Sequence, residues 1–103
     1  MAWIMVMFDL PVGTKEERRS ATWFRESLLK DGYMMIQYSV YARPCPSYDR
    51  TKTHLRRLEK IVPPSGQVRA LKLTDAQWGR MKVFYQQEAT QPEVRLKQTI
   101  LFD

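Results

Sequence analysis

The sequence predicts a small α/β (α+β) domain in which two helices cover one face of a four-stranded sheet. Three observations support this: an unbroken apolar run near the N-terminus, two segments with apolar residues at helical spacing, and turn signals between them. The 103 residues are enough for one domain with one hydrophobic core. Both helices are expected on the same side, because crossover connections are right-handed. The other face is left open, and we expect a second copy of the chain to cover it.

The first strand is predicted at residues 2–9 and ends in a carboxylate. Seven apolar residues run from Ala2 to Phe8, a pattern typical of a strand buried on both faces. Pro11 and Gly13 then supply a turn. Asp9 therefore leaves the carboxyl end of the strand, where open α/β sheets commonly bind ligands, and it is the first functional candidate. The alternative is that Asp9 only begins the turn, as aspartate often does.

The first helix is predicted from Thr14 to about Lys30. Thr14 and Glu17 match a capping box, and Gly32 is the residue expected just past the helix end. Three residues at helical spacing are expected to form its buried stripe: Ala21, Phe24 and Leu28.

Residues 33–43 form the second predicted strand region, and Gln37 marks a possible break into two shorter strands. Alternate residues of a strand point to opposite faces. The set that suits a core face is Met34, Ile36, Tyr38, Val40 and Ala42. The other set is amphipathic, as faces that meet a partner often are, and consists of Tyr33, Met35, Gln37, Ser39 and Tyr41.

The second helix is predicted at residues 48–61, after Ser47 as its N-cap. Its expected inward residues are Tyr48, Leu55, Leu58 and either Ile61 or Val62. His54 lacks a second ligand at a suitable spacing, so a surface histidine is expected rather than a metal ligand. Cys45 lies between two prolines and is expected to be inert.

Basic residues concentrate on and before this second helix. Residues 43–60 hold six basic residues against two acidic ones, a net charge of +4 in a chain whose total is +6. Rows of arginine and lysine on a helix suit phosphate groups. The candidates for nucleic-acid binding are Arg43, Arg50, Lys52, Arg56, Arg57 and Lys60. Arg18 and Arg19 on the first helix are further candidates, although the glutamates interleaved with them also fit a solvated face.

The rest of the chain is predicted to contain a third strand at 67–73, a capped helical turn at 74–77 and a fourth strand at 80–85. We expect residues 1–85 to form the domain and residues 86–103 to be a linker and a C-terminal strand. The apolar end of that strand is expected to pair with a sheet edge, in this chain or in another subunit, through Ile100, Leu101 and Phe102.

Composition limits the protein class. With 44% hydrophobic residues the chain is not expected to be disordered, and it has no apolar run long enough for a membrane span. A single cysteine excludes an internal disulfide, so a reducing cytoplasmic compartment is expected. The basic balance, with a pI of about 9.7, favours an anionic partner.

Several segments in order resemble the small CRISPR-associated adaptation subunit, a family described as endoribonucleases and as the central dimer of the spacer-integration complex. They are Val6-Met7-Phe8-Asp9-Leu10-Pro11, then Arg18-Arg19, Gly32 and Gln37-Tyr38-Ser39-Val40-Tyr41. The match extends over nearly the full length, including a basic second helix and an apolar C-terminal strand. No single motif is specific, but the ordered set is.

The resemblance implies a ferredoxin-like sandwich with an antiparallel sheet and a homodimer in which the C-terminal strand packs on the partner's sheet. It also implies that Asp9 holds Mg²⁺ at the dimer axis, and that the partners are a CRISPR integrase subunit and double-stranded DNA. The expected interface residues are Trp3, Tyr33, Met35, Gln37, Ser39, Tyr41, Ile100, Leu101 and Phe102.

Three functions stay open from the sequence. One is a metal-dependent endonuclease acting through Asp9. A second is a non-catalytic DNA scaffold, favoured because each chain offers one suitable carboxylate and no histidine placed as a general base. The third is a related toxin-like ribonuclease or a single-stranded RNA binder that would stack bases on Trp3, Tyr33 and Tyr41.

Overall fold

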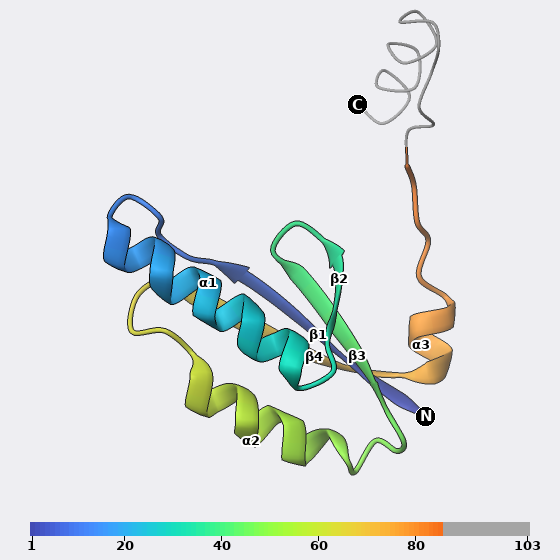
Figure 1. The fold of residues 1–103 in the computed structure, drawn as a ribbon. Helices are drawn as coiled ribbons and strands as arrows, with labels where there is room; N and C mark the ends of the chain where they lie inside the picture. Colours follow the sequence, from blue (N-terminus) through green and yellow to red (C-terminus); the bar gives the residue numbers. More distant parts are fainter. Residues whose placement is uncertain (86–103) are drawn as a thin grey trace, which may run out of the picture.

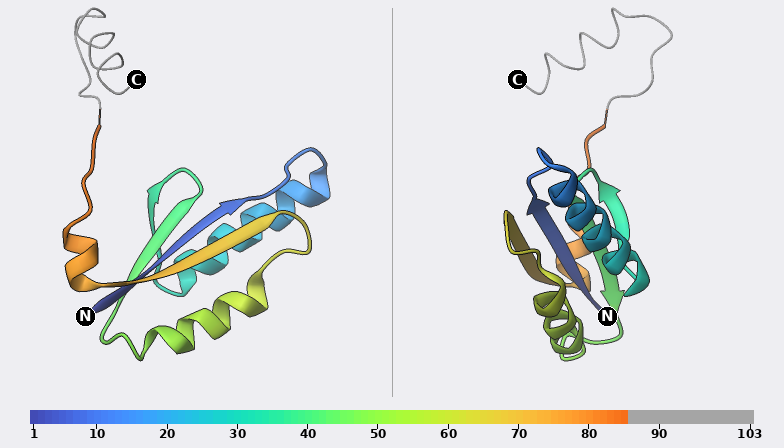
Figure 2. Two further views of the ribbon diagram at one scale, coloured as in Figure 1. Left: turned by 180° about the vertical axis from the view of Figure 1, so that it is seen from behind. Right: turned by 60° about the vertical axis from the view of Figure 1, so that its left-hand side comes forward.

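The centre of the protein is an antiparallel sheet with the strand order β2-β3-β1-β4. The computed structural model describes residues 1–85. The strands are β1 (Ala2–Asp9), β2 (Met34–Gln37), β3 (Val40–Cys45) and β4 (Gln67–Thr74). Helices α1 (Lys15–Lys30) and α2 (Thr51–Ile61) lie side by side over one sheet face, and the short α3 (Asp75–Gly79) follows β4 (Figures 1 and 2). The predicted ferredoxin-like α+β fold is confirmed.

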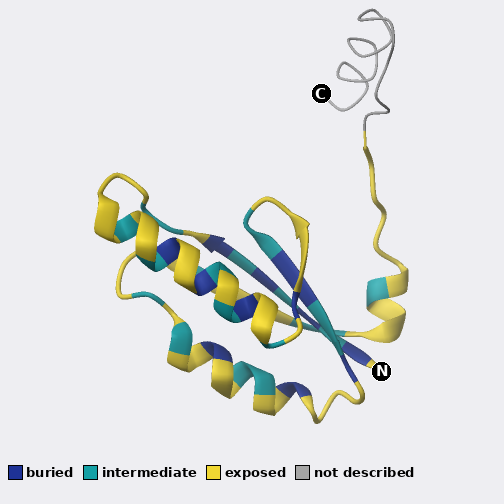
Figure 3. Ribbon diagram, in the orientation of Figure 1, coloured by how far each residue is buried: buried dark blue, intermediate teal, exposed yellow. Residues whose placement is uncertain are grey.

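β1 lies between β3 and β4 and separates two layers of side chains. Its alternate residues Ala2, Ile4, Val6 and Phe8 are buried, and the last three belong to the core under the helices. Figure 3 shows buried and intermediate colours alternating along β1. The intervening residues Trp3, Met5 and Met7 face the other side and are only half-buried. The strand is therefore apolar on both faces, as predicted. Within residues 1–85, α1 and α2 cover one of these faces, and only Trp78 of the short α3 packs on the other, against Trp3.

α1 begins and ends as the sequence predicts. Thr14 Oγ1 accepts a hydrogen bond from the Glu17 amide (3.1 Å), and Glu17 Oε1 accepts one from the Thr14 amide (2.9 Å), which completes the capping box. Gly32, with φ +90°, follows the helix. The predicted stripe of Ala21, Phe24 and Leu28 is buried, and the Phe24 ring meets the Phe8 ring edge-on at 5.1 Å.

The region from 33 to 45 is split into β2 and β3, which confirms the predicted break near Gln37. The predicted faces, however, are wrong for most of it. Tyr33 and Tyr41, expected at a dimer interface, are buried under the helices, whereas Met34, Ile36 and Tyr38 are exposed. Tyr41 pairs with Val6 on the helix-facing side of the sheet. Both sets contain large apolar or aromatic residues, so alternation alone could not identify which one the helices cover.

The predicted strand at 80–85 is not formed. The capping box of Thr74 and Gln77 starts α3 directly after β4, and residues 81–85 are exposed and without regular structure. Tyr48, expected to point inward, is also exposed, because α2 starts at Thr51 rather than Tyr48. Of the two alternatives at the end of α2, Ile61 packs against the core and Val62 is exposed. No helix among residues 1–85 is long and apolar enough to cross a membrane. The predictions for residues 86–103, including Ile100, Leu101 and Phe102, lie outside the described residues.

Candidate metal and nucleic-acid site

Asp9 is the last residue of β1 and is exposed. It pairs with Gln67 of β4 and, by strand alternation, lies on the same face as Met7, away from the helices. A cavity of about 210 Å³ opens at this position and is lined by Met7, Phe8, Asp9, Gln67 and Arg69. Asp9 is therefore available to a ligand on the open face of the sheet.

Two loops fix the end of β1 that carries Asp9. The turn between β2 and β3 contributes the Ser39 carbonyl, which accepts a hydrogen bond from the Phe8 amide (3.1 Å). On the other side, Gly66 (φ +92°) lies so close that a Cβ there would be 2.6 Å from the Asp9 carbonyl oxygen. Only glycine fits this approach, and sequence reasoning missed that role.

The donor set at Asp9 provides only part of a magnesium site. Mg²⁺ prefers six oxygen ligands and usually keeps several waters. Residues 1–85 contain no group of three His, Cys, Asp or Glu side chains that could hold a metal ion. The neighbouring Gln67 Oε1 accepts a long hydrogen bond from Arg69 Nη2 (3.4 Å), and Arg69 adds positive charge. Asp9 thus fits a metal only if a second carboxylate comes from elsewhere, such as another copy of the chain.

The basic residues of α2 lie in the helical layer, on the other side of the sheet from Asp9. Arg50, Lys52, Arg56 and Lys60 are exposed there. The ion pair of Lys52 with Asp49 (3.2 Å) is also exposed and contributes little stability. These side chains are free to meet phosphates, but they do not share the cavity that Asp9 lines.

Arg18 and Arg19 occupy the first turns of α1. Arg18 donates from Nη1 to the carbonyls of Val12 (3.1 Å) and Gly13 (3.3 Å) in the loop after β1. Arg19 is exposed beside Arg18 and Lys15. Arg18 therefore braces the loop behind Asp9, and neither arginine lines the cavity at Asp9.

Arg43 and Arg57, also predicted to bind nucleic acid, meet at Asp31 after the end of α1. Arg57 Nη1 donates to Asp31 Oδ1 (2.7 Å), and Arg43 Nη1 donates to the Asp31 carbonyl. His54 Nδ1 lies 2.9 Å from Asp31 Oδ2. Arg43 is mostly buried and thus has a structural role, while Arg57 keeps 60% of its side chain exposed.

His54 is not the surface histidine that was expected, because only 14% of its side chain is exposed. Its partner Asp31 precedes it by 23 residues, so no local spacing could reveal the contact. Partial burial alone would raise the pKa of Asp31. The hydrogen bonds from His54 and Arg57, with the attraction of their charges, outweigh burial and lower the pKa of Asp31 below its ordinary value.

Of the residues expected at a dimer interface, some contact other parts of this chain and others are exposed. Trp3 stacks on Trp78 of α3 at 4.1 Å, and its Nε1 donates to Asp75 Oδ1 (3.0 Å). Met35 and Gln37 are exposed on the edge strand β2, and Ser39 (φ 64°) forms the turn beside β1. Trp3 is thus attached to α3 of its own chain, while Met35 and Gln37 remain accessible.

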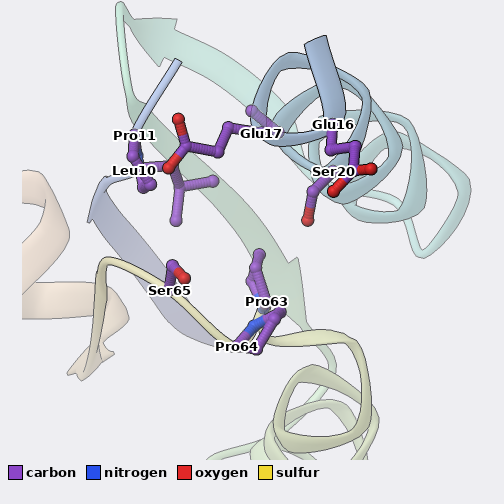
Figure 4. Close-up of a pocket in the computed structure, with 9 residues that line it drawn as sticks. Leu10, Pro11, Glu16, Glu17, Ser20, Pro63, Pro64 and Ser65 are labelled. Atoms are coloured by element: carbon purple, nitrogen blue, oxygen red, sulfur yellow. The ribbon is translucent and has the colours of Figure 1, made fainter. Parts of the chain in front are cut away.

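A second cavity, of about 260 Å³, lies behind the end of β1 (Figure 4). It is bounded by Leu10 and Pro11 after β1, by Glu16, Glu17 and Ser20 of α1, and by residues 63–65. Glu17 already serves the helix cap, and Asp9 is not among the lining residues. This cavity is therefore separate from the candidate site.

Replacing Gly66 with alanine is expected to destabilise the protein more than replacing Gly32, which has nearly the same φ. Positive φ alone costs an alanine about 1–2 kcal/mol. At Gly66 the new Cβ also meets the Asp9 carbonyl, which is backbone, whereas at Gly32 it meets only the end of the Arg43 side chain. Urea unfolding should show at least about 1 kcal/mol of additional loss for Gly66→Ala. Equal losses would contradict the close approach at Asp9.

Asp31→Asn is expected to lower the free energy of unfolding at pH 7 by about 1–3 kcal/mol, because charged hydrogen bonds are lost. The folded pKa of Asp31 is depressed, so its contribution is complete above the ordinary value of 3.8 and is lost as the pH falls through the folded value. Unfolding curves recorded from pH 7 down to acid should therefore converge for wild type and variant. Asp49→Asn, at an exposed pair, is the control and should change stability little. A constant difference down to low pH would argue against this role of Asp31.

A family model and several curated proteins are similar in sequence to this chain. The family model "CRISPR associated protein Cas2" matches residues 1–81. A protein from Parvibaculum lavamentivorans named "CRISPR-associated endoribonuclease Cas2" is 46% identical over 82 residues, covering 80% of this chain and 81% of that protein. Relatives with the same name from Flavobacterium psychrophilum (38% over 100 residues, 97% and 87% covered) and Paracidovorax avenae (45% over 85 residues, 82% and 79% covered) are similar. The chain belongs to the Cas2 family of CRISPR-associated proteins.

Proposed function

We propose that this protein is a subunit of the CRISPR spacer-acquisition complex, in which a homodimer binds duplex DNA and scaffolds an integrase. We also propose a weak Mg²⁺-dependent endonuclease activity at Asp9. The observation that carries the proposal is the open sheet face with the exposed Asp9 carboxylate at its edge. Membership of the Cas2 family supports a role in spacer acquisition, and the relatives' name, endoribonuclease, supports a nuclease activity.

The homodimer is supported by the apolar character of the open face. Met5 and Met7 of β1 are only half-buried, and the neighbouring Leu71 of β4 keeps 49% of its surface exposed. A sheet usually buries an apolar face against another layer. A second copy related by a two-fold axis would cover the apolar part of this face around Met5 and Leu71. It would also bring a second Asp9 to the first at the end of β1, where the cavity stays open to substrate.

Duplex binding is supported by the row of Lys52, Arg56 and Lys60, which follow one another at four-residue steps on exposed α2. Residues at this spacing share one helix face and can follow a phosphate backbone. The alternative of base stacking on the sheet is weakened, because Tyr33 and Tyr41 are buried and Trp3 is stacked on Trp78. Recognition of duplex phosphates fits these positions better than recognition of unpaired bases.

For cleavage, the two Asp9 carboxylates of a dimer would hold the metal between the subunits. Magnesium bound there supplies acidification of a water and stabilisation of charge on the phosphate. Gly66 and the Ser39 carbonyl hold the end of β1 in place, so that Asp9 needs little reorganisation. The cavity at Asp9 has no histidine among its lining residues, and activity is accordingly expected to be low.

Asp9→Ala is expected to reduce Mg²⁺-dependent cleavage of RNA and DNA by on the order of 100-fold, since the metal loses its protein ligand. Cleavage is measured with purified protein, with Mg²⁺ and with EDTA. Glu26→Gln, which removes an exposed carboxylate from α1, is the control and should leave the rate unchanged. Equal activity of wild type and Asp9→Ala would refute the catalytic part of the proposal and leave the scaffold role standing.

The double variant Arg56→Gln and Lys60→Gln is expected to weaken duplex binding and to reduce the slope of log affinity against log salt by about 2 for each subunit whose α2 contacts the duplex. The matched control is Arg80→Gln with Lys82→Gln, which removes the same charge from exposed positions after α3. Fluorescence anisotropy with a duplex over a salt series measures both quantities. If both double variants change the slope equally, the α2 row has no special role.

A further inference from the structure

We propose that Arg69, oriented by Gln67, forms a phosphate-binding subsite beside Asp9 on the open sheet face. The subsite would bind a phosphodiester of nucleic acid in the same cavity as the candidate metal ligand. This inference rests on the proposed function of Asp9 and names the group that holds the substrate there. This subsite lies on the sheet surface and is separate from the row of Lys52, Arg56 and Lys60 on α2.

The strand register brings Arg69 to Asp9. Asp9 pairs with Gln67, and Met7 pairs with Arg69, so all four residues lie on one face of two adjacent strands. Asp9 and Arg69 are diagonal neighbours, which in an antiparallel pair are about 7–8 Å apart. Both line the cavity of about 210 Å³. This separation leaves room for a phosphate between the carboxylate and the guanidinium.

The guanidinium of Arg69 has unused hydrogen-bonding capacity. Among residues 1–85 it forms no ion pair with Asp9, and its one hydrogen bond is the long contact from Nη2 to Gln67 Oε1 (3.4 Å). The side chain is exposed, and its remaining N–H groups are free. An arginine fork binds two phosphate oxygens at once, and the Gln67 contact restricts where the fork points.

The positive charge of Arg69 offsets the negative charge of Asp9 in the cavity. A phosphodiester that approaches Asp9 without a metal meets a negative carboxylate, which repels it. Arg50, Lys52, Arg56 and Lys60 cannot offset this repulsion, because they lie in the helical layer. Arg69 is the cation that lines the cavity itself. It would retain substrate before the metal binds and would hold it in position afterwards.

The plain alternative is that Arg69 is a solvated charge on an exposed strand. Under that alternative its removal matters no more than removal of any other exposed arginine. Arg80, which follows α3 and does not line the cavity, is the matched comparison. The two arginines have the same charge and similar exposure, so they differ mainly in their distance from Asp9.

The test measures binding of the full chain to a duplex DNA and to a single-stranded RNA of equal length, in EDTA, by fluorescence anisotropy. Arg69→Gln is expected to weaken binding about tenfold, the effect of losing a charged contact of about 1.4 kcal/mol. Arg80→Gln should weaken it less than twofold. Asp9→Asn should leave affinity unchanged or raise it, because the repelling charge is gone. Arg69→Lys should recover part of the loss. The arm that loses affinity identifies whether DNA or RNA supplies the phosphate.

Equal binding by Arg69→Gln and Arg80→Gln on both nucleic acids would overturn the subsite. Because the measurement is made in EDTA, it does not depend on cleavage. Failure of the catalytic proposal is seen instead as unchanged cleavage by Asp9→Ala in Mg²⁺, so the two failures are distinguishable. Urea unfolding of each variant checks the fold. If Arg69→Gln is unfolded, the comparison is made with Arg69→Met, which also removes the charge, and binding equal to that of Arg80→Gln then overturns the proposal.

Discussion

The hydrogen bonding of β1 on both of its edges is the constraint on which the rest of the structure depends. β3 and β4 pair with it in antiparallel register from Ala2 onward, so the strand cannot shift without breaking two ladders. The buried residues of β1 pack against α1 and α2, while Met5 and Met7 lie on the opposite, open face. This pairing fixes the position of Asp9 at the end of β1, together with the contacts that Gly66 and Ser39 make there.

The sheet divides the functional candidates into two groups. One side carries Asp9, Gln67 and Arg69 together with apolar residues, and the other carries the exposed cations of α2. A protein arranged in this way can bind nucleic acid along its helical layer without using Asp9. Two of the functions left open by the sequence, DNA scaffold and nuclease, therefore depend on different surfaces and can be separated by mutation.

The local excess of positive charge in residues 43–60 overestimates how many basic side chains are available to bind nucleic acid. Arg43 and Arg57 contribute to the local excess of +4, yet both contact Asp31 at the end of α1. Together with His54 they join the end of α1 to β3 and α2. Tyr33 and Tyr41 show the same effect for aromatic residues. Their rings fill the core under the helices, and burial raises the pKa of the Tyr33 hydroxyl.

The sequence by itself determined the elements whose causes are local: the apolar β1, the capping box at Thr14, the stripe of Ala21, Phe24 and Leu28, and the position of Asp9 at a strand end. Only the tertiary structure decided which face of residues 33–43 is covered, that 80–85 form no strand, and that Arg69 joins Asp9. Strand alternation defines two faces but does not say which one meets a helix. Contacts such as His54 with Asp31, or Asp9 beside Gln67 and Arg69, depend on strand register and helix packing, which no local pattern encodes.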